Sequence, residues 1–457
     1  MLNLAPLPIV PDCPCDIELL DGMGVQEEQA SQDIQEAIKV ILQGLGEDIS
    51  REGLRKTPLR VAKALLEGTS GCRENPKDIV EGALFPESDS SCVQVNVQGL
   101  SLFSFCESCL LPFQVQCHVS YVPSNDAVVG LSKLSRVAAA FAKRLQDPQR
   151  LADEICTALY NEIKSAGVGV ILNCLHIRFP NMESLVHDSD CERWMRKAVR
   201  SGCGVFEDEK ADVWVDFLRY LKLGGNKVDF CLLKGIPGLP WCPNQFSSAS
   251  IVASKAEQQN QDMVVAVSSL LKSLGEDPAR KELVDTPRRF IGWLMSFRNL
   301  NLEMKLNCSL HGQQGSFVAN GQAELKDCIR FEQNLALWSQ CEHHLLPFYG
   351  KVHIGFVCPE GRIPIRKSLL QSIVHFYGFK LQVQERLTSQ IANTISSMVE
   401  DVIVFVEAEH MCMMCRGVKQ IGSKTITEVR LGKFLTDRAA QDAAWDYVLS
   451  VKSPDAF

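Results

Sequence analysis

Four residues in the second half of the chain have the types and the spacing of metal ligands and acid–base groups. Cys341 and His344 are separated by two residues in CEHH, so one tight loop can present both side chains to a single ion. Further on, His410 and Cys412 lie two apart in VIVFVEAEHMCMM, which predicts a strand with both side chains on one face. Cys341, His344 and Cys412 would leave the fourth tetrahedral position open to water, as in catalytic zinc sites.

Two histidines would then lie beside the metal. His343 and His410 are candidate acid–base groups, because histidine titrates close to neutral pH. Each motif alone has a plainer interpretation. A single CxxH is weak evidence in a chain with 19 cysteines, and His410 could be an ordinary strand residue. The spacing supports a metal site but does not by itself name a reaction.

The elements that position these residues occur twice in the chain. LGEDISREGLRKTPLRVAKAL begins at Leu45, and LGEDPARKELVDTPRRFIGWL begins at Leu274. CESCLLPF from Cys106 matches CEHHLLPF from Cys341, and QDPQRL (146–151) matches QVQERL (382–387). Three matches in the same order, at nearly constant separation, indicate an internal duplication.

The hydrophobic pattern predicts the same elements in each half. Apolar residues four apart at 151–163 and 387–399 predict helices, as do those at 34–45 and 263–274. Alternating residues at 113–121 and 348–356 predict strands. We therefore expect two α+β modules, at residues 26–230 and 256–457, with an N-terminal extension at 1–25. The Pro- and Ser-rich residues 231–255 would be a linker.

Composition narrows the class of protein. The chain has 457 residues, of which 46% are hydrophobic, and it has no apolar run of the roughly 18 to 20 residues that span a bilayer. The net charge of −8 argues against a nucleic-acid partner. The first 24 residues contain no Lys or Arg, unlike a secretory or organelle-targeting segment, so we expect free thiols and a cytoplasmic location.

Taken together, the motifs resemble those of GTP cyclohydrolase I. The resemblance is carried by CEHHLLPF, by QVQERLT (382–388) and by HMCMMCRG (410–417), with TPLR (57–60) and VGLSKLSR (129–136) in the first half. It covers both halves, as in the fused two-module form of plants. It implies the T-fold, in which antiparallel sheets backed by helices associate into barrels with active sites between neighbouring modules. We therefore expect a homodimer or a larger ring.

The resemblance also implies a reaction and its residues. GTP and water would give 7,8-dihydroneopterin triphosphate and formate, in the first step of tetrahydrofolate synthesis. Zn²⁺ would be held by Cys341, His344 and Cys412, with His343 and His410 as acid–base groups. Gln384 and Glu385 would recognise guanine, since a carboxylate can accept from the N1–H and the amino group, which adenine does not offer together.

The two halves depart from the family pattern in opposite ways. At a constant offset, the first half has Ser108 and Cys109 in place of the two loop histidines, Cys174 in place of His410, and Pro148 and Gln149 in place of the guanine pair. The second half reads RKSLLQS (366–372) where the first reads GLSKLSR (130–136), so Lys133 and Arg136 are replaced by Leu369 and Ser372. The family uses this motif to bind triphosphate.

Because the losses are complementary, we expect one composite site. The second half would supply the metal and the acid–base groups, and a neighbouring first half would supply Ser132, Lys133, Arg136 and Arg60. Arg416 would remain as a cation of the second half. Lys133 and Arg136 could instead be solvated charges on a helix face, but that leaves the loss in the second half unexplained.

Two further hypotheses stay open at this point. Cys106, Cys109 and His176 occupy the aligned ligand positions of the first half, so a second metal is conceivable there, although buried thiols and a surface histidine are a plainer account. The alternative to an enzyme is a non-catalytic GTP-binding regulatory or scaffold paralogue. The intact metal and histidine set of the second half argues against it.

Overall fold

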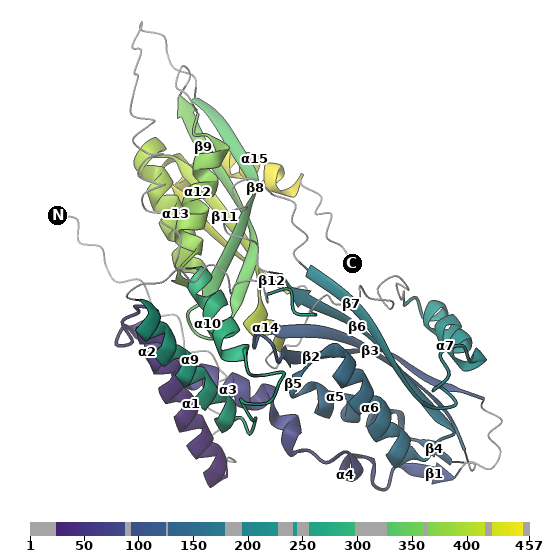
Figure 1. Cartoon of the computed structure of the whole chain (residues 1–457). Helices are drawn as coiled ribbons and strands as arrows, with labels where there is room; N and C mark the ends of the chain where they lie inside the picture. The colour runs from purple at the N-terminus through teal and green to yellow at the C-terminus, as the bar shows by residue number, and fades with distance from the viewer. Residues whose placement is uncertain are drawn as a thin grey trace, which may run out of the picture.

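The computed structural model describes residues 24–86, 93–124, 127–178, 194–226, 241–244, 256–297, 327–359, 364–415 and 423–450. Nearly all of the predicted extension (1–25), most of the predicted linker (231–255), and Arg416 lie outside these ranges. The described chain forms two five-stranded sheets, each backed by helices (Figure 1). This confirms two tandem α+β modules.

The first module is built on the sheet β5-β2-β3-β6-β7. Its strands are β2 (Val95–Cys106), β3 (Pro112–Val122), β5 (Leu145–Gln146), β6 (Gly167–Ile177) and β7 (Trp194–Gly204), with a separate pair β1 (Leu84–Pro86) and β4 (Ala127–Val129). Its helices are α1 (Val25–Gly44), α2 (Glu52–Arg55), α3 (Thr57–Gly68), the short 3₁₀ turn Ser70–Arg73, α4 (Pro76–Val80), α5 (Leu131–Ala142), α6 (Pro148–Ile163) and α7 (Asp212–Leu223).

The second module repeats this plan on the sheet β10-β8-β9-β11-β12. Its strands are β8 (Asp327–Cys341), β9 (Pro347–Pro359), β10 (Leu381–Gln382), β11 (Val402–His410) and β12 (Lys424–Leu431). Its helices are α9 (Ala256–Ser273), α10 (Thr286–Ser296), α12 (Lys367–Gly378), α13 (Gln384–Val399), α14 (Met411–Cys415), the 3₁₀ turn Gly432–Leu435 and α15 (Arg438–Leu449).

The two sheets share details of register. In each, the short strand pairs in parallel with its neighbour and the other pairs are antiparallel. Both carry a bulge at the same place, between Val97 and Leu100 and between Glu332 and Leu335. The bulge requires a left-handed residue, which is Gly99 (φ 72°) in one case and Asn334 (φ 57°) in the other. The duplication therefore extends to backbone geometry.

Apolar stripes attach the helices to the sheets as the periodicity predicts. The stripe Leu151, Ile155, Leu159 and Ile163 on α6 is buried, and so are Leu387, Ile391 and Ile395 on α13. The opposite sheet faces are covered by α7 and α15, which form separate small cores around Phe217 and Ala444. Each sheet is thus enclosed between helices.

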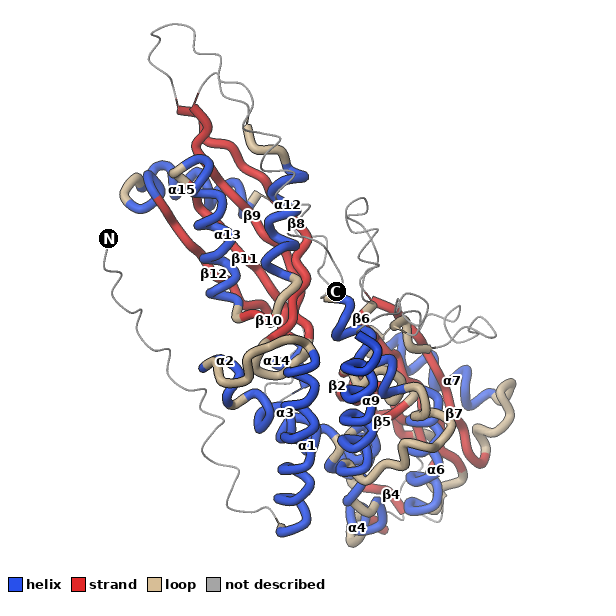
Figure 2. The backbone as a smooth tube through the Cα atoms, turned by 60° about the vertical axis from the view of Figure 1, so that its left-hand side comes forward, coloured by secondary structure: helices blue, strands red, loops and turns tan. Residues whose placement is uncertain are grey.

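Four helices of the two modules pack together beside the junction. Figures 1 and 2 show α1 and α3 of the first module grouped with α9 of the second; α1 lies along α9, and α10 packs on α9. Ile38 and Leu42 on α1 and Val267 and Leu271 on α9 are fully buried there. One continuous apolar core runs through both modules.

The helix N-termini are exchanged between the modules. Thr57, the first residue of α3, donates its hydroxyl to the backbone oxygen of Glu342 in the second module at 2.6 Å. Thr286, the first residue of α10, donates to the backbone oxygen of Glu107 in the first module at 2.5 Å. The CxxC/CxxH loop of each module is therefore held by a helix of the other module.

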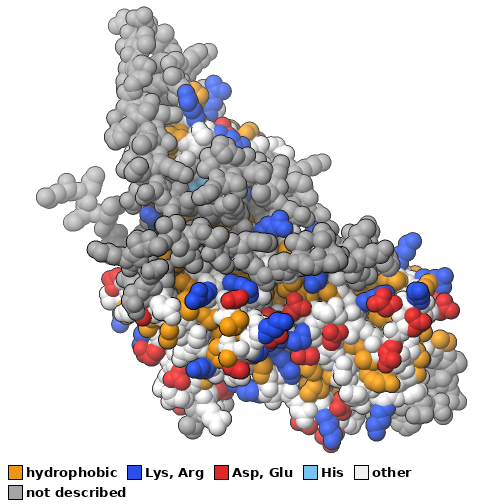
Figure 3. All heavy atoms as spheres, in the orientation of Figure 1, with side chains coloured by type: hydrophobic (Ala, Val, Ile, Leu, Met, Phe, Trp, Pro, Cys, Tyr) orange, Lys and Arg blue, Asp and Glu red, His pale blue; other side chains and the backbone are white. Residues whose placement is uncertain are grey.

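The surface carries mixed charge. On the face shown in Figure 3, acidic and basic side chains are interspersed over the lower part of the molecule. Within the described residues, none of the helices has the length and apolarity that crossing a membrane would require.

The exchanged hydrogen bond leads to a stability prediction. We expect Thr57→Val to destabilise the chain by about 1 to 3 kcal/mol, because it leaves the buried carbonyl of Glu342 without its donor. Thr69→Val is the matched control, since Thr69 is also buried but bonds Leu65 within its own helix, where the Thr69 N–H still satisfies the same oxygen. Urea-unfolding midpoints compare the two. Equal midpoints for Thr57→Val and Thr69→Val would show that the hydrogen bond between the modules does not contribute to stability.

Candidate metal and active site

The three predicted metal ligands of the second module lie together. Cys341 ends β8, His344 follows in the loop, and Cys412 is in the short helix α14. Their ligand atoms all lie within 4.8 Å of one another, and Cys341 Sγ is 3.8 Å from His344 Nδ1. Both cysteines are buried. Two sulfurs and one nitrogen suit zinc, and three protein ligands leave one tetrahedral position for another group.

One local prediction is wrong. The sequence predicted His410 and Cys412 on one face of a strand, but β11 ends at His410 and Cys412 lies in helix α14. The ladder with β12 ends at Glu409 and Lys424, and the following MCMMC contains residues that favour a helix over a strand. The turn into α14 brings the Cys412 sulfur back to the loop.

The cluster favours a thiolate at Cys341. The hydrogen bond with Cys412 holds the pKa of the Cys341 thiol well below its usual range, and this effect outweighs burial, which raises it. Contacts with His344 and His410 act in the same direction as Cys412. A metal needs the deprotonated sulfur, so this environment is suited to binding a cation.

His343 lies at the edge of the cluster, with a side chain that is 35% exposed. Burial lowers its pKa, and the charge of Arg60 on α3 lowers it further. The structure thus brings the predicted Arg60 of the first module close to His343 within one chain, by way of the exchanged helix.

His410 is oriented by Gln384. Its Nε2 lies 2.7 Å from Gln384 Oε1, and its ring stacks on Phe348 at 4.4 Å. The Gln384 amide nitrogen faces the backbone oxygens of Val406 and Thr425 at 3.0 and 2.9 Å, which defines the orientation of the amide. Because the amide oxygen only accepts, His410 must carry its proton on Nε2.

The predicted guanine pair is divided between two environments. Gln384 is 2% exposed, and its polar atoms are engaged by His410 and the sheet. Glu385, the next residue on the first turn of α13, is exposed. Of the two, Glu385 is the side chain placed to meet a ligand directly.

Glu342 is a residue of this site to which the sequence analysis gave no role. Its buried carboxylate accepts from Arg51 of the first module at 2.6 Å and from Arg386 of α13 at 2.5 Å. In addition, a Cβ at Gly53 would lie 2.2 Å from its Oε1, so only glycine permits this approach. The repeat could have indicated this role, because both loops have a glutamate at this position. The first is Glu107 in CESC, which pairs with Arg150 and Arg280.

The predicted phosphate ligands lie elsewhere in the chain. Ser132, Lys133 and Arg136 are on the first half of α5, near α4, and Lys133 donates to the backbone oxygen of Ile79 at 2.8 Å. In the second module, Leu369 is buried in the core and the Ser372 hydroxyl bonds the Ser368 carbonyl. The chain does not bring the α5 residues to the cluster through any contact seen among the described residues.

Strand register corrects the comparison of the two halves. Phe113 pairs with His176 on β6, and its counterpart Phe348 pairs with His410 on β11. His176 therefore occupies the place of His410, and the expectation that Cys174 does so is wrong. The place of Cys412 falls on Arg178. The offset changes because His176 lies 13 residues after the end of α6, whereas His410 lies 11 residues after the end of α13.

Comparison with known proteins gives a consistent result. The sequence model of the family described as GTP cyclohydrolase I matches residues 34–189 and 263–448, one match in each half. The chain is 53% identical over 436 residues to a protein of Solanum lycopersicum named GTP cyclohydrolase 1, covering 93% of this chain and 94% of the relative. It is 48% identical over 442 residues to one of Arabidopsis thaliana with the same name, covering 93% of each.

A shorter relative matches about one half of the chain. A protein of a Nostoc species named GTP cyclohydrolase 1 2 is 36% identical over 207 residues, which are 44% of this chain and 91% of the relative. The two-module length is thus shared with the plant relatives.

We predict that Cys412→Ala lowers the metal content of the purified chain by one equivalent, because it removes one of three ligands of the cluster. Elemental analysis after dialysis against a chelator measures this. Cys358→Ala is the matched control, a buried cysteine on β9 outside the cluster. An unchanged content in Cys412→Ala would contradict the assignment.

Proposed function

The chain belongs to the GTP cyclohydrolase I family, and we propose that it converts GTP and water to 7,8-dihydroneopterin triphosphate and formate, the entry to tetrahydrofolate synthesis. The observation that carries this is the convergence of Cys341, His344 and Cys412 beside His343 and His410. We also propose the module bounds 26–230 and 256–457, with residues 231–255 as the linker.

We propose Zn²⁺ as the metal. The three ligands are two thiols and one imidazole, a donor set that zinc prefers over the harder divalent cations. When held by these three residues, zinc would make water nucleophilic at neutral pH, which is the chemistry that opening the purine ring at C8 requires.

The two histidines have different tasks. His343 is part-exposed and its pKa is lowered, so at neutral pH it is the unprotonated imidazole and can accept a proton from the reacting groups. His410 is held rigidly between Phe348 and Gln384 with its proton on Nε2. Because the Nε2 proton is held by Gln384, the other ring nitrogen, Nδ1, is the atom that can accept a proton and return it without reorientation of the ring.

Substrate recognition falls to exposed groups around the cluster. Glu385 can accept from N1–H and the amino group of guanine, and Gln384 acts on the substrate through His410. Arg60 of the same chain lies beside His343 and can pair with the phosphates, with Arg416 as a further cation.

The remaining phosphate contacts require a second chain. Ser132, Lys133 and Arg136 lie on α5, away from the cluster of their own chain, while Leu369 of the second module packs in the core and Ser372 bonds Ser368 within its own helix. We therefore propose that the chain self-associates as a homodimer or a larger ring. In that assembly, α5 of one chain completes the site of its neighbour.

The composite site predicts complementation between inactive variants. Lys133→Ala/Arg136→Ala should lose at least about tenfold in kcat/KM for GTP per residue, since each charged contact contributes roughly 1.5 to 3 kcal/mol. His343→Ala should be inactive. About one site in four should be complete among randomly paired chains, and one site in two in a dimer that contains one chain of each variant. Oxidised neopterin fluorescence measures turnover.

Co-expression of the two differently tagged chains, followed by double-affinity purification, provides the mixed sample. Activity no greater than the sum of the separate variants would place the phosphate contacts within one chain. If neither the wild-type chain nor the mixture converts GTP, the proposed function itself is wrong.

A second kinetic prediction concerns Gln384. We expect Gln384→Met, which keeps the volume but removes the amide, to lower kcat by about 10- to 100-fold with little change in KM. Gln371→Met is the matched control, because Gln371 also bonds a histidine (His375) and a backbone carbonyl (Ala336) in the same module, and lies on α12. A raised KM with unchanged kcat would instead indicate that Gln384 contacts guanine.

A further inference from the structure

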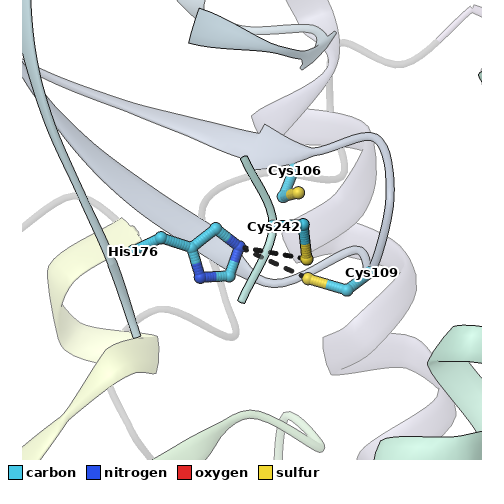
Figure 4. A group of neighbouring side chains, drawn as sticks. All are labelled: Cys106, Cys109, His176 and Cys242. Carbon is cyan, nitrogen blue, oxygen red and sulfur yellow. Dashed lines mark hydrogen bonds between the residues drawn. The ribbon is translucent and has the colours of Figure 1, made fainter. Parts of the chain in front are cut away.

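A second cluster of potential metal ligands lies inside the first module. Cys106, Cys109, His176 and Cys242 point toward one another (Figure 4), and their ligand atoms all lie within 4.8 Å. All four side chains are fully buried. His176 Nε2 is 3.4 Å from the Cys109 sulfur and 4.0 Å from the Cys242 sulfur.

We propose that these four side chains bind a structural zinc ion as a Cys₃His site. With zinc–sulfur bonds of about 2.3 Å and zinc–nitrogen bonds of about 2.0 to 2.1 Å, the edge of a tetrahedron between sulfur and nitrogen is about 3.6 Å. The two observed distances lie on either side of this value. Four protein ligands fill the coordination shell, so the site has no open position for water or substrate.

The tautomer of His176 is the one that a metal ligand requires. His176 Nδ1 lies 2.9 Å from the backbone oxygen of Ile177, which can only accept, so the proton is on Nδ1. The lone pair of Nε2 therefore faces the sulfurs. A backbone carbonyl that fixes the tautomer in this way is the usual partner of a metal-binding histidine.

Cys242 distinguishes this cluster from a remnant of the catalytic set. Strand register puts His176 in the place of His410, and the place of Cys412 falls on Arg178. The third sulfur comes instead from the segment between the modules, which sequence comparison of the two halves does not align with any ligand. The first module has exchanged an open three-ligand arrangement for a closed one.

Contacts of the residues next to Cys242 hold the inter-module segment against the first module. Trp241 packs edge-on against Phe113 and against His176, both at 5.6 Å. Asn244 donates to the oxygen of Ile177 at 3.1 Å. From the second module, Trp293 of α10 donates to the backbone oxygen of Cys109 at 3.2 Å. A metal here would join the β2–β3 loop, β6 and the inter-module segment beside the exchanged helix α10.

The test is the metal content of the full-length chain after dialysis against a chelator. We expect two zinc ions per wild-type chain, one in Cys242→Ala, one in Cys412→Ala, and none in the double variant. Cys117→Ala is the matched control and should keep two, because Cys117 is a buried cysteine of β3 outside both clusters.

If Cys242→Ala does not fold, the absorption spectrum of a cobalt-loaded variant tests the same site. Cys412→Ala loaded with Co²⁺ retains only the Cys₃His site, and should show the intense visible bands of tetrahedral cobalt together with strong thiolate-to-cobalt charge transfer. Three results would each overturn the proposal: one zinc per wild-type chain, two zinc ions in Cys242→Ala, or a disulfide among Cys106, Cys109 and Cys242 found by thiol titration of the denatured chain.

Discussion

A buried carboxylate at the junction of the modules controls the architecture. Glu342 lies beside the metal ligands with a side chain that is 2% exposed, and burial of an unpaired charge there would be strongly unfavourable. It is neutralised by one arginine from each module, Arg51 and Arg386. Glu107 repeats the arrangement with Arg280 and Arg150. Each of these two loops therefore needs the other module in place, and residues 256–457 alone would lose Arg51, the Thr57 hydroxyl and the apolar face of α1 that packs on α9.

The CESC loop of the first module and the CEHH loop of the second are held in the same way but carry different side chains. In the second module the loop offers two histidines, His344 in the cluster with Cys341 and Cys412, and His343 beside Arg60. In the first module cysteine replaces the ligand histidine, and the strand histidine turns toward the sulfurs instead of toward a glutamine. Pro148 occupies the position of Gln384, so nothing there could hold a catalytic imidazole as Gln384 holds His410. The same arrangement of elements thus presents three potential metal ligands in one module and four in the other.

The sequence predicted the features that depend on local pattern. Helical stripes four residues apart, strand alternation, and the Cys341–His344–Cys412 set all follow from spacing within short segments, and the structure has them. The exchange of helices was not predictable in this way, because α3 and α10 begin with the similar motifs TPLR and TPRR, which do not say which module each helix packs on. The register of β6 was missed because the connection that precedes it differs in length between the modules. Cys242 was missed because its position is determined by the path of the inter-module segment and by no periodic signal.

Fusion explains why the two modules could lose opposite functions. A covalent tandem has equal numbers of both modules, so every assembly that contains a second module also contains a first. If sites are composite, as proposed, phosphate-binding side chains are needed on only one module, and position 369 can be a leucine that packs in the core. Metal and acid–base residues are likewise needed on only one. In the first module the corresponding loop lies against the inter-module segment, where Cys242 adds a fourth potential ligand beside the contact that Trp293 of the second module makes with Cys109.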